Sequence, residues 1–213
     1  MSTTTVPETP GRKTKWDVKR EASYQALIES AVRVFHTRGY AATTVADIVA
    51  GTGYTAGAFY HHFSGKAECF WHVIEHRERQ RGDWTSIAAQ VDRATNSLEQ
   101  LLVQVFARFA ASMGGYAEWV LVMVDFFQQH RDDAESLARL ARIYGHWRDD
   151  IRRFVESLVA NGWIEPVSDP ALLAQQMFAF GEGIIVHREL YGRAEGAAAL
   201  DRALIDGLVK LLR

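Results

Sequence analysis

Two histidines and a glutamate near residue 74 are spaced like the ligands of a zinc hydrolase. In the segment His72-Val73-Ile74-Glu75-His76 the histidines stand four residues apart, so both would lie on one face of a helix. The H-x-x-E-H pattern binds zinc in one class of metalloprotease. The pattern is short, however, and a third ligand cannot be placed from the sequence. We therefore expect no metal, no cofactor and no catalytic residue, and keep an all-helical metal-dependent hydrolase using His72, Glu75 and His76 as the alternative.

A carboxylate in an apolar segment is the second candidate for chemistry. Asp125 interrupts the run WVLVMVDFF at residues 119–127. Residues 116–129 are apolar on nearly every side of a helix, so we expect a central helix without a solvent face for Asp125. A buried carboxylate needs a partner, which is a ligand, an internal histidine, or an internal arginine such as Arg108 or Arg148. Three further polar residues stand in apolar surroundings on the next-to-last predicted helix: Gln176, Glu182 and His187.

Residues 43–66, TTVADIVAGTGYTAGAFYHHFSGK, contain the most informative pattern. Thr44 can cap a short helix, with Asp47 at the reciprocal position of the cap. Gly53 allows a tight turn, and Thr55 can cap a second short helix. Two short helices joined by such a turn, behind a longer amphipathic helix, are typical of a helix-turn-helix.

The second short helix of this pattern carries residue types suited to DNA. Gly57 and Ala58 are small, so the helix can approach the floor of a groove closely. Tyr60, His61 and Lys66 carry donors that can reach phosphates, and a helix N-terminus is itself a favourable phosphate site.

The charge distribution favours an anionic partner for the first third of the chain. Residues 1–66 carry eight basic and five acidic side chains, whereas residues 67–213 carry sixteen and twenty-one. The competing interpretation is a solvated charged tail. The single cysteine, Cys69, excludes a disulfide framework, and no apolar run is long enough to span a membrane. We expect a cytoplasmic protein without a membrane partner.

The spacing of apolar residues predicts an all-α fold. They recur at steps of three and four, and strand-type alternation is absent; we expect about nine helices. We predict a disordered basic tail over residues 1–15, a helix-turn-helix DNA-binding domain over 16–76, and a C-terminal helical bundle over 77–213. The strongly polar segment 75–83 would connect the two bodies.

The N-terminal pattern resembles a known family. It is similar to the DNA-binding domain of TetR-family (tetracycline-repressor-like) transcriptional regulators. The residues that carry the resemblance are Leu27-Ile28, Ser30-Ala31, Val34-Phe35, Gly39-Tyr40, Thr43-Thr44-Val45, Ile48, Gly53, Thr55, Gly57, Phe59-Tyr60, His62-Phe63 and Lys66. The family more often has Ala-Gly-Val-Ser at positions 52–55 and an aliphatic residue at position 69. These departures leave the target DNA sequence open.

The resemblance implies a ligand-responsive transcriptional regulator. Such a protein would bind a palindromic operator as a homodimer, most often as a repressor, and would be released by a small, largely apolar molecule. The residues expected to contact DNA are Thr44, Thr55, Gly57, Ala58, Tyr60, His61 and Lys66. Thr44 and Thr55 also have a purely structural reading as helix caps. A helical adaptor without DNA is a further alternative, which salt-sensitive binding to a palindromic duplex would exclude.

The resemblance also places a ligand cavity among the middle helices and a dimer interface on the last two. We expect Asp125 to be the cavity's principal polar group, which suits an aromatic and also a cationic ligand. The expected lining is Phe106, Phe109, Trp119, Met123, Asp125, Phe126, Tyr144, Trp147 and Met177. The expected interface residues are Ala174, Ala179, Gly183, Leu204 and Leu208. An intramolecular core would give the same pattern.

Overall fold

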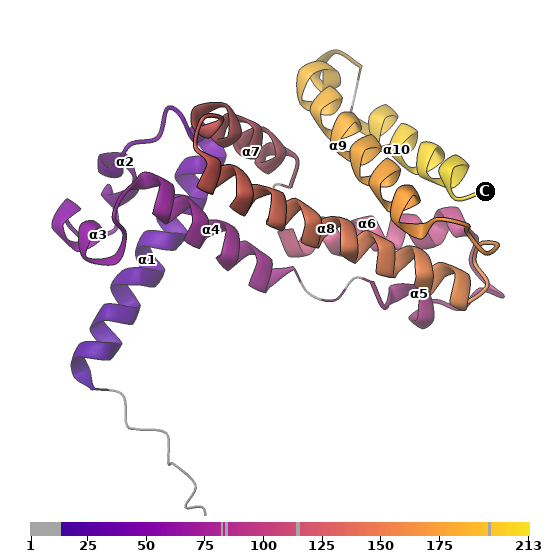
Figure 1. Ribbon diagram of the computed structural model, residues 1–213, viewed down its shortest axis with the longest axis horizontal. Helices are drawn as coiled ribbons and strands as arrows, with labels where there is room; N and C mark the ends of the chain where they lie inside the picture. The colour runs from indigo at the N-terminus through magenta and orange to yellow at the C-terminus, as the bar shows by residue number, and fades with distance from the viewer. Residues whose placement is uncertain (1–13, 82, 84, 114–115, 196) are drawn as a thin grey trace, which may run out of the picture.

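The computed structural model describes residues 14–81, 83, 85–113, 116–195 and 197–213, and within them the chain forms ten α-helices and no strand (Figure 1). The all-α prediction is confirmed. The helix beyond the expected nine is the four-residue α5. The first five are α1 (Lys15–Arg38), α2 (Val45–Val49), α3 (Ala56–His62), α4 (Lys66–Gln80) and α5 (Ile87–Gln90). The others are α6 (Leu98–Met113), α7 (Tyr116–His130), α8 (Ala134–Ala160), α9 (Pro170–Glu195) and α10 (Ala197–Leu211).

Helix α1 begins earlier than the sequence predicts. Thr14 caps it with a capping box in which its hydroxyl accepts from the Asp17 N–H at 3.2 Å, and such a cap satisfies donors that the first turn leaves free. Of the predicted tail, residues 1–13 lie outside the described part of the chain. Thr14 and Lys15 belong to the start of α1.

Helices α1 to α4 enclose a tightly filled core. Leu27 and Phe35 of α1, Ile48 of α2, Phe59 of α3 and Phe70 of α4 are all fully buried in one cluster. Helix α4 continues without a break through the predicted domain boundary at residue 76, and in Figure 1 it leads from this end of the molecule toward the remaining helices. The end of α4 therefore joins the two parts of the protein.

A second core lies between α6, α8, α9 and α10. Leu101 and Leu102 of α6, Phe154 of α8, Met177 of α9 and Leu208 of α10 are its buried members. Helices α9 and α10 lie against each other at the end of the molecule opposite α3 (Figure 1).

Helix α7 departs from the expectation of a central helix buried on all sides. Leu121, Val124 and Phe127 are exposed by 39%, 41% and 45%, respectively. Its opposite side packs on the first body, where Phe126 is fully buried and stacks on Phe70 with the ring centroids 4.4 Å apart. The prediction was wrong because an apolar composition does not show how many neighbours surround a helix.

Candidate DNA-binding face and ligand cavity

The helix-turn-helix is built by two capped short helices. The Thr44 hydroxyl accepts from the Asp47 N–H at 3.1 Å, and the Asp47 carboxylate accepts from the Thr44 N–H at 2.9 Å. These hydrogen bonds from Thr44 hold the pKa of Asp47 below its usual value. The Thr55 hydroxyl accepts from the Ala58 N–H at 3.3 Å. In the turn, Gly53 has φ +77°, a conformation that favours glycine.

Helix α3 presents a face that is open to solvent. Tyr60 is 59% exposed, and Gly57 and His61 are also exposed. Phe59, between them, is fully buried and anchors the helix to the core. The structure thus brings the expected residues of α3 onto one accessible surface, while their contact with DNA stays a prediction.

Lys66 has an internal role that the sequence did not reveal. Its ammonium donates to the carbonyl oxygens of Tyr40 at 2.9 Å and of Ala41 at 3.3 Å, and it lies 4.3 Å from the centre of the Tyr40 ring. Burial lowers the pKa of Lys66. Because an ammonium has three donors, one remains for a phosphate. Lys66 therefore holds the turn between α1 and α2 in addition to any contact with DNA.

The histidine at the end of α3 packs inward. His62 Nε2 lies 2.8 Å from the Ser23 hydroxyl, and its ring meets the edge of Tyr24. Burial lowers the pKa of His62, and the nearby charges of His61 and Arg20 lower it further. A neutral His62 is thus part of the contact between α1 and α3.

The H-x-x-E-H residues each have a partner outside the motif, and His72 Nδ1 also lies 3.9 Å from the Glu75 carboxylate. His72 Nδ1 lies 3.1 Å from the Tyr24 hydroxyl, the Glu75 carboxylate pairs with Arg139 at 2.6 Å, and His76 Nε2 lies 3.0 Å from the Gln80 amide. Among the described residues, no group of three or more histidine, cysteine or acidic side chains is placed to hold a metal. The hydrolase alternative is not favoured by this arrangement.

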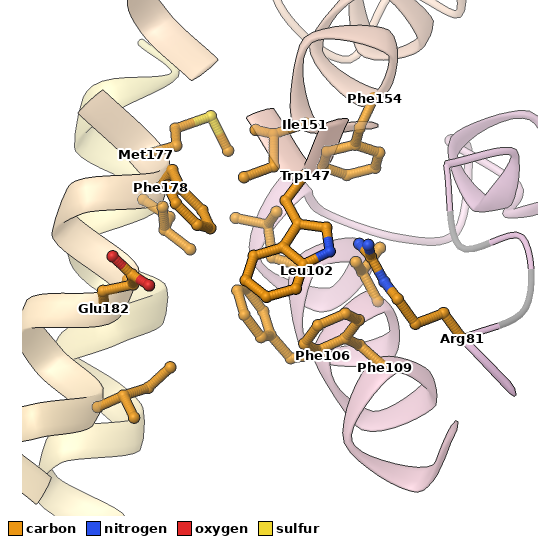
Figure 2. A pocket seen from close by; sticks show the side chains of 14 residues that line it. Arg81, Leu102, Phe106, Phe109, Trp147, Ile151, Phe154, Met177, Phe178 and Glu182 are labelled. Atoms are coloured by element: carbon orange, nitrogen blue, oxygen red, sulfur yellow. The ribbon is translucent and has the colours of Figure 1, made fainter. Parts of the chain in front are cut away.

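An apolar cavity of about 100 Å³ lies between α6, α8, α9 and α10 (Figure 2). Its polar groups are Arg81, just beyond the end of α4, and Glu182 of α9. Figure 2 shows the Trp147 indole between them, beside Phe106. The other lining residues are apolar: Leu102, Val105, Phe109, Ile151, Phe154, Met177, Phe178, Gly181, Ile185 and Leu208.

The expected lining residues divide into three groups. Phe106, Phe109, Trp147 and Met177 line this cavity. Trp119, Met123 and Tyr144 line a smaller adjacent chamber, which also includes Trp147. Asp125 and Phe126 line neither space.

Asp125 is therefore not the polar group of the cavity, and that expectation was wrong. Its carboxylate accepts from the Ala41 N–H at 2.7 Å, in the same turn that Lys66 holds. The alternative of an ion pair with Arg108 or Arg148 is not what the structure shows either. Asp125 joins α7 to the turn between α1 and α2.

Glu182 takes the place that Asp125 was expected to fill. Burial raises the pKa of Glu182, while a hydrogen bond from Tyr144 lowers it. Its position among apolar residues of α9 singled it out in the sequence, but its helix neighbours gave no sign of which element it faces. Arg81 and Phe178 were missed, and the polar segment around Arg81 gave no sign of burial.

A polar network connects the cavity to α4. Glu78 accepts from the Trp147 indole N–H at 2.7 Å and from Arg81 at 3.0 Å. Arg81 also pairs with Asp150 at 3.0 Å, and Asp150 pairs with Arg153. Arg81 and Asp150 are buried. Two walls of the cavity, Trp147 and Arg81, are therefore bonded to a helix that forms part of the DNA-binding end.

Comparison with known proteins identifies the family. The sequence model described as "Bacterial regulatory proteins, tetR family" matches residues 27–73, which include α2, α3 and most of α4. The chain belongs to the TetR family.

Two curated relatives are transcriptional regulators. The uncharacterized HTH-type regulator YwcC of Bacillus subtilis is 25% identical over 202 residues, which cover 92% of this chain and 88% of that protein. The HTH-type repressor KstR2 of Mycobacterium tuberculosis is 34% identical over 118 residues, about half of either chain (54% and 53%). This TetR-family chain is accordingly a DNA-binding transcriptional regulator.

Solved structures share the fold of this TetR-family protein. A putative TetR-family regulator from Mesorhizobium loti superposes with a TM-score of 0.68 at 19% identity, covering 94% of this chain and 98% of that one. FadR from Bacillus subtilis, in complex with stearoyl-CoA, gives 0.64 at 17% identity and covers 89% and 100%. The SmeT–triclosan complex gives 0.61 at 20% identity and covers 89% and 90%.

The expected interface residues of this TetR-family chain differ in accessibility. Ala179 and Gly183 are exposed on α9, and Leu204 of α10 is half-buried. Ala174 and Leu208 are 1% and 2% exposed within the single chain, so assigning them to a dimer interface was wrong. They fill the interior of the protomer because α10 packs its leucines onto α6 and α9.

Among the described residues, no helix of this TetR-family protein is both long and apolar enough to cross a membrane.

Proposed function

We propose that this protein is a homodimeric repressor that binds a palindromic operator through α3 and releases it when a small, largely apolar molecule enters the cavity. In this proposal residues 16–76 form the reading head, 77–213 the ligand-binding and dimerisation domain, and 1–15 a basic tail. A bacterial regulator of this kind would act in the cytoplasm.

The observation that carries the proposal is the double hydrogen bond at Glu78. Glu78 lies on α4 and accepts from both Trp147 and Arg81, which line the cavity. Movement of Trp147 therefore breaks or strains a hydrogen bond to α4, the helix that runs from the reading head into the ligand-binding domain. A ligand changes DNA affinity only if it binds the two arrangements with different affinity.

The size of the cavity supports such a difference. Its volume of about 100 Å³ is smaller than the ~150 Å³ of an engineered cavity that takes up benzene. A larger molecule fits only if the walls separate, which would favour a different arrangement of α4. FadR and SmeT, which share the fold, bind stearoyl-CoA and triclosan, respectively, so the fold can accommodate ligands with much apolar surface.

On the DNA side, the contacts would come from the exposed side of α3 and from the caps. Tyr60 and His61 would reach phosphates, whereas Gly57 and Ala58 would lie at the base edges. Thr44 and Thr55 would cap their helices and also contact the DNA backbone. Lys66 would donate its remaining N–H to a phosphate.

The homodimer would form through the exposed side of α9 and α10. Ala179, Gly183 and Ala203 are accessible there, and small side chains allow two helices to approach closely. Replacing Ala179 and Ala203 together by arginine should give a folded monomer that binds a palindromic duplex weakly. A dimer of unchanged stability in sedimentation would exclude this face.

The proposal is tested by selecting duplexes from a random pool and measuring affinity at several salt concentrations. We expect a palindromic site whose affinity falls steeply with salt, and lower affinity when an apolar effector is added. Trp147→Phe keeps an aromatic side chain but removes the N–H donor to Glu78, so it should weaken the response to the effector. Trp163→Phe is the matched control, because Trp163 donates to Ala88 far from α4. Binding without sequence preference, or an equal response in both variants, would contradict the proposal.

A further inference from the structure

A second, smaller chamber adjoins the apolar cavity, and a few polar side chains contribute to its mostly apolar wall. Its volume is about 30 Å³, and it lies where residues of α4, α7, α8 and α9 meet. Trp147 and Glu182 line both the chamber and the cavity. The two spaces are therefore neighbours separated by shared side chains.

One wall of the chamber carries a buried donor without a partner. Trp119 is 3% exposed, and its indole N–H has no hydrogen-bond partner among the described residues. Two other indoles show the usual situation, since Trp147 donates to Glu78 and Trp163 to the Ala88 carbonyl. A buried donor left unpaired is costly, so the Trp119 N–H is an exception that needs an acceptor.

No hydrogen bond joins the Trp119 indole N–H to either carboxylate that lines the chamber, Glu78 or Glu182. The Arg77 guanidinium lies 4.3 Å from the centre of the Trp119 ring, and a guanidinium only donates. Glu182 also lines the chamber, where its carboxyl group receives a hydrogen bond from Tyr144. Trp119, which carries an unpaired donor, and Glu182, which carries an acceptor, thus both line the chamber.

We propose that this chamber is the polar subsite of the effector pocket, and that the effector is an uncharged molecule with an apolar body in the cavity and a hydroxyl group in the chamber. The hydroxyl oxygen accepts a hydrogen bond from the Trp119 indole N–H. The hydroxyl group in turn donates a hydrogen bond to the Glu182 carboxyl group. This inference rests on the proposed function, which supplies the role of the cavity.

The volume and the chemistry select a hydroxyl. The chamber has about 30 Å³ open to a water-sized sphere, more than the ~10–15 Å³ that one water molecule requires, so it has room for a small head group. A hydroxyl both accepts and donates, whereas an ammonium cannot accept from Trp119. Phenols and alcohols share the required chemistry.

The test is a titration of the full-length protein that involves no DNA, so its result is independent of the operator. The probes are benzyl alcohol and phenethyl alcohol, each beside its hydrocarbon, toluene and ethylbenzene. Indole N–H signals are followed by NMR, with the Trp119 signal assigned by its loss in Trp119→Phe. At least one alcohol should move the Trp119 signal downfield, and its hydrocarbon should not. The Trp163 signal is the internal control, because that indole already has a partner.

Affinities provide the second readout. Trp119→Phe should lower the affinity for the alcohol about threefold to tenfold, as expected for one lost hydrogen bond. It should leave the affinity for the hydrocarbon nearly unchanged. Trp163→Phe should change neither. The inference is overturned if neither alcohol moves the Trp119 signal more than its hydrocarbon does, if Trp119→Phe weakens both probes equally, or if no probe binds. The wild-type comparison of alcohol with hydrocarbon holds even if the variant folds poorly.

Discussion

The two ends of the molecule use aromatic residues in opposite ways. In the DNA-binding end, Phe35, Phe59 and Phe70 are fully buried. Their close packing fixes the arrangement of the helices. In the ligand-binding end, Phe106 and Phe178 are only partly buried and surround free space. Close packing fixes the geometry of a surface that must match a duplex, whereas loose packing leaves room for a ligand and for movement.

The largest expected effect tests this difference directly. Phe59→Ala should destabilise the protein by about 3–5 kcal/mol, because it empties a filled core, and should abolish DNA binding. Phe106→Ala should cost less than half of that, because its ring already borders a cavity. The measurement is urea unfolding of both variants. Equal losses would show that the two cores are packed alike.

The second largest loss of stability is expected at the buried ion pair between Arg81 and Asp150, which links the end of α4 to α8. Asp150→Asn removes one charge from the buried pair with Arg81 and should cost about 2–3 kcal/mol. Glu156→Gln breaks an exposed pair with Arg152 on the same helix and should cost less than about 1 kcal/mol. The free energies of unfolding of the two variants are measured by denaturant unfolding. A harmless Asp150→Asn would mean that the ends are not joined through this network.

A smaller effect is expected at the helix caps. Thr44→Ala removes a reciprocal capping box and should cost about 1 kcal/mol. Thr55→Ala removes a single longer hydrogen bond at 3.3 Å, so its cost should be smaller. Both variants need thermal unfolding and a DNA-binding assay. If Thr55→Ala loses more affinity than stability, Thr55 contacts the operator in addition to capping.

The smallest effect concerns pH. The pKa of His62 is lowered in the folded state, so the unfolded chain binds the proton more readily. The contribution of His62 to stability is therefore present above its unfolded pKa of about 6.5 and is lost as pH falls below that value. Between pH ~7.5 and ~5.5, the melting temperature of the wild type should fall more than that of His62→Gln. If the melting temperatures of the wild type and of His62→Gln depend on pH in the same way, protonation of His62 does not weaken the contact between α1 and α3.

The sequence predicted the local features of the DNA-binding end well. The caps at Thr44 and Thr55 and the turn at Gly53 depend on residues within a few positions of each other, so their types and spacing are sufficient. Lys66 was the exception, because its partners, the carbonyls of residues 40 and 41, lie twenty-five or more positions away.

The ligand-binding end was harder to predict, because its features depend on which helices become neighbours. Asp125 was correctly recognised as unusual for an apolar helix, but only the packing of α7 shows that it meets Ala41. Glu182 was recognised in the same way, yet not assigned to the cavity. Ala174 and Leu208 show the same limit, since an apolar face does not reveal whether it meets its own chain or a partner.

The missing side chain at Gly207 has a mechanical consequence. A Cβ atom at this position would lie 2.1 Å from the Cζ atom of the Phe180 ring, so any other residue would displace that ring or move α10 away from α9. The Phe180 ring of α9 therefore packs directly on the backbone of α10. Two copies that associate along these helices would meet on a closely packed helix pair. We then expect movement of α4 to turn the reading heads instead of disturbing the contact between the copies.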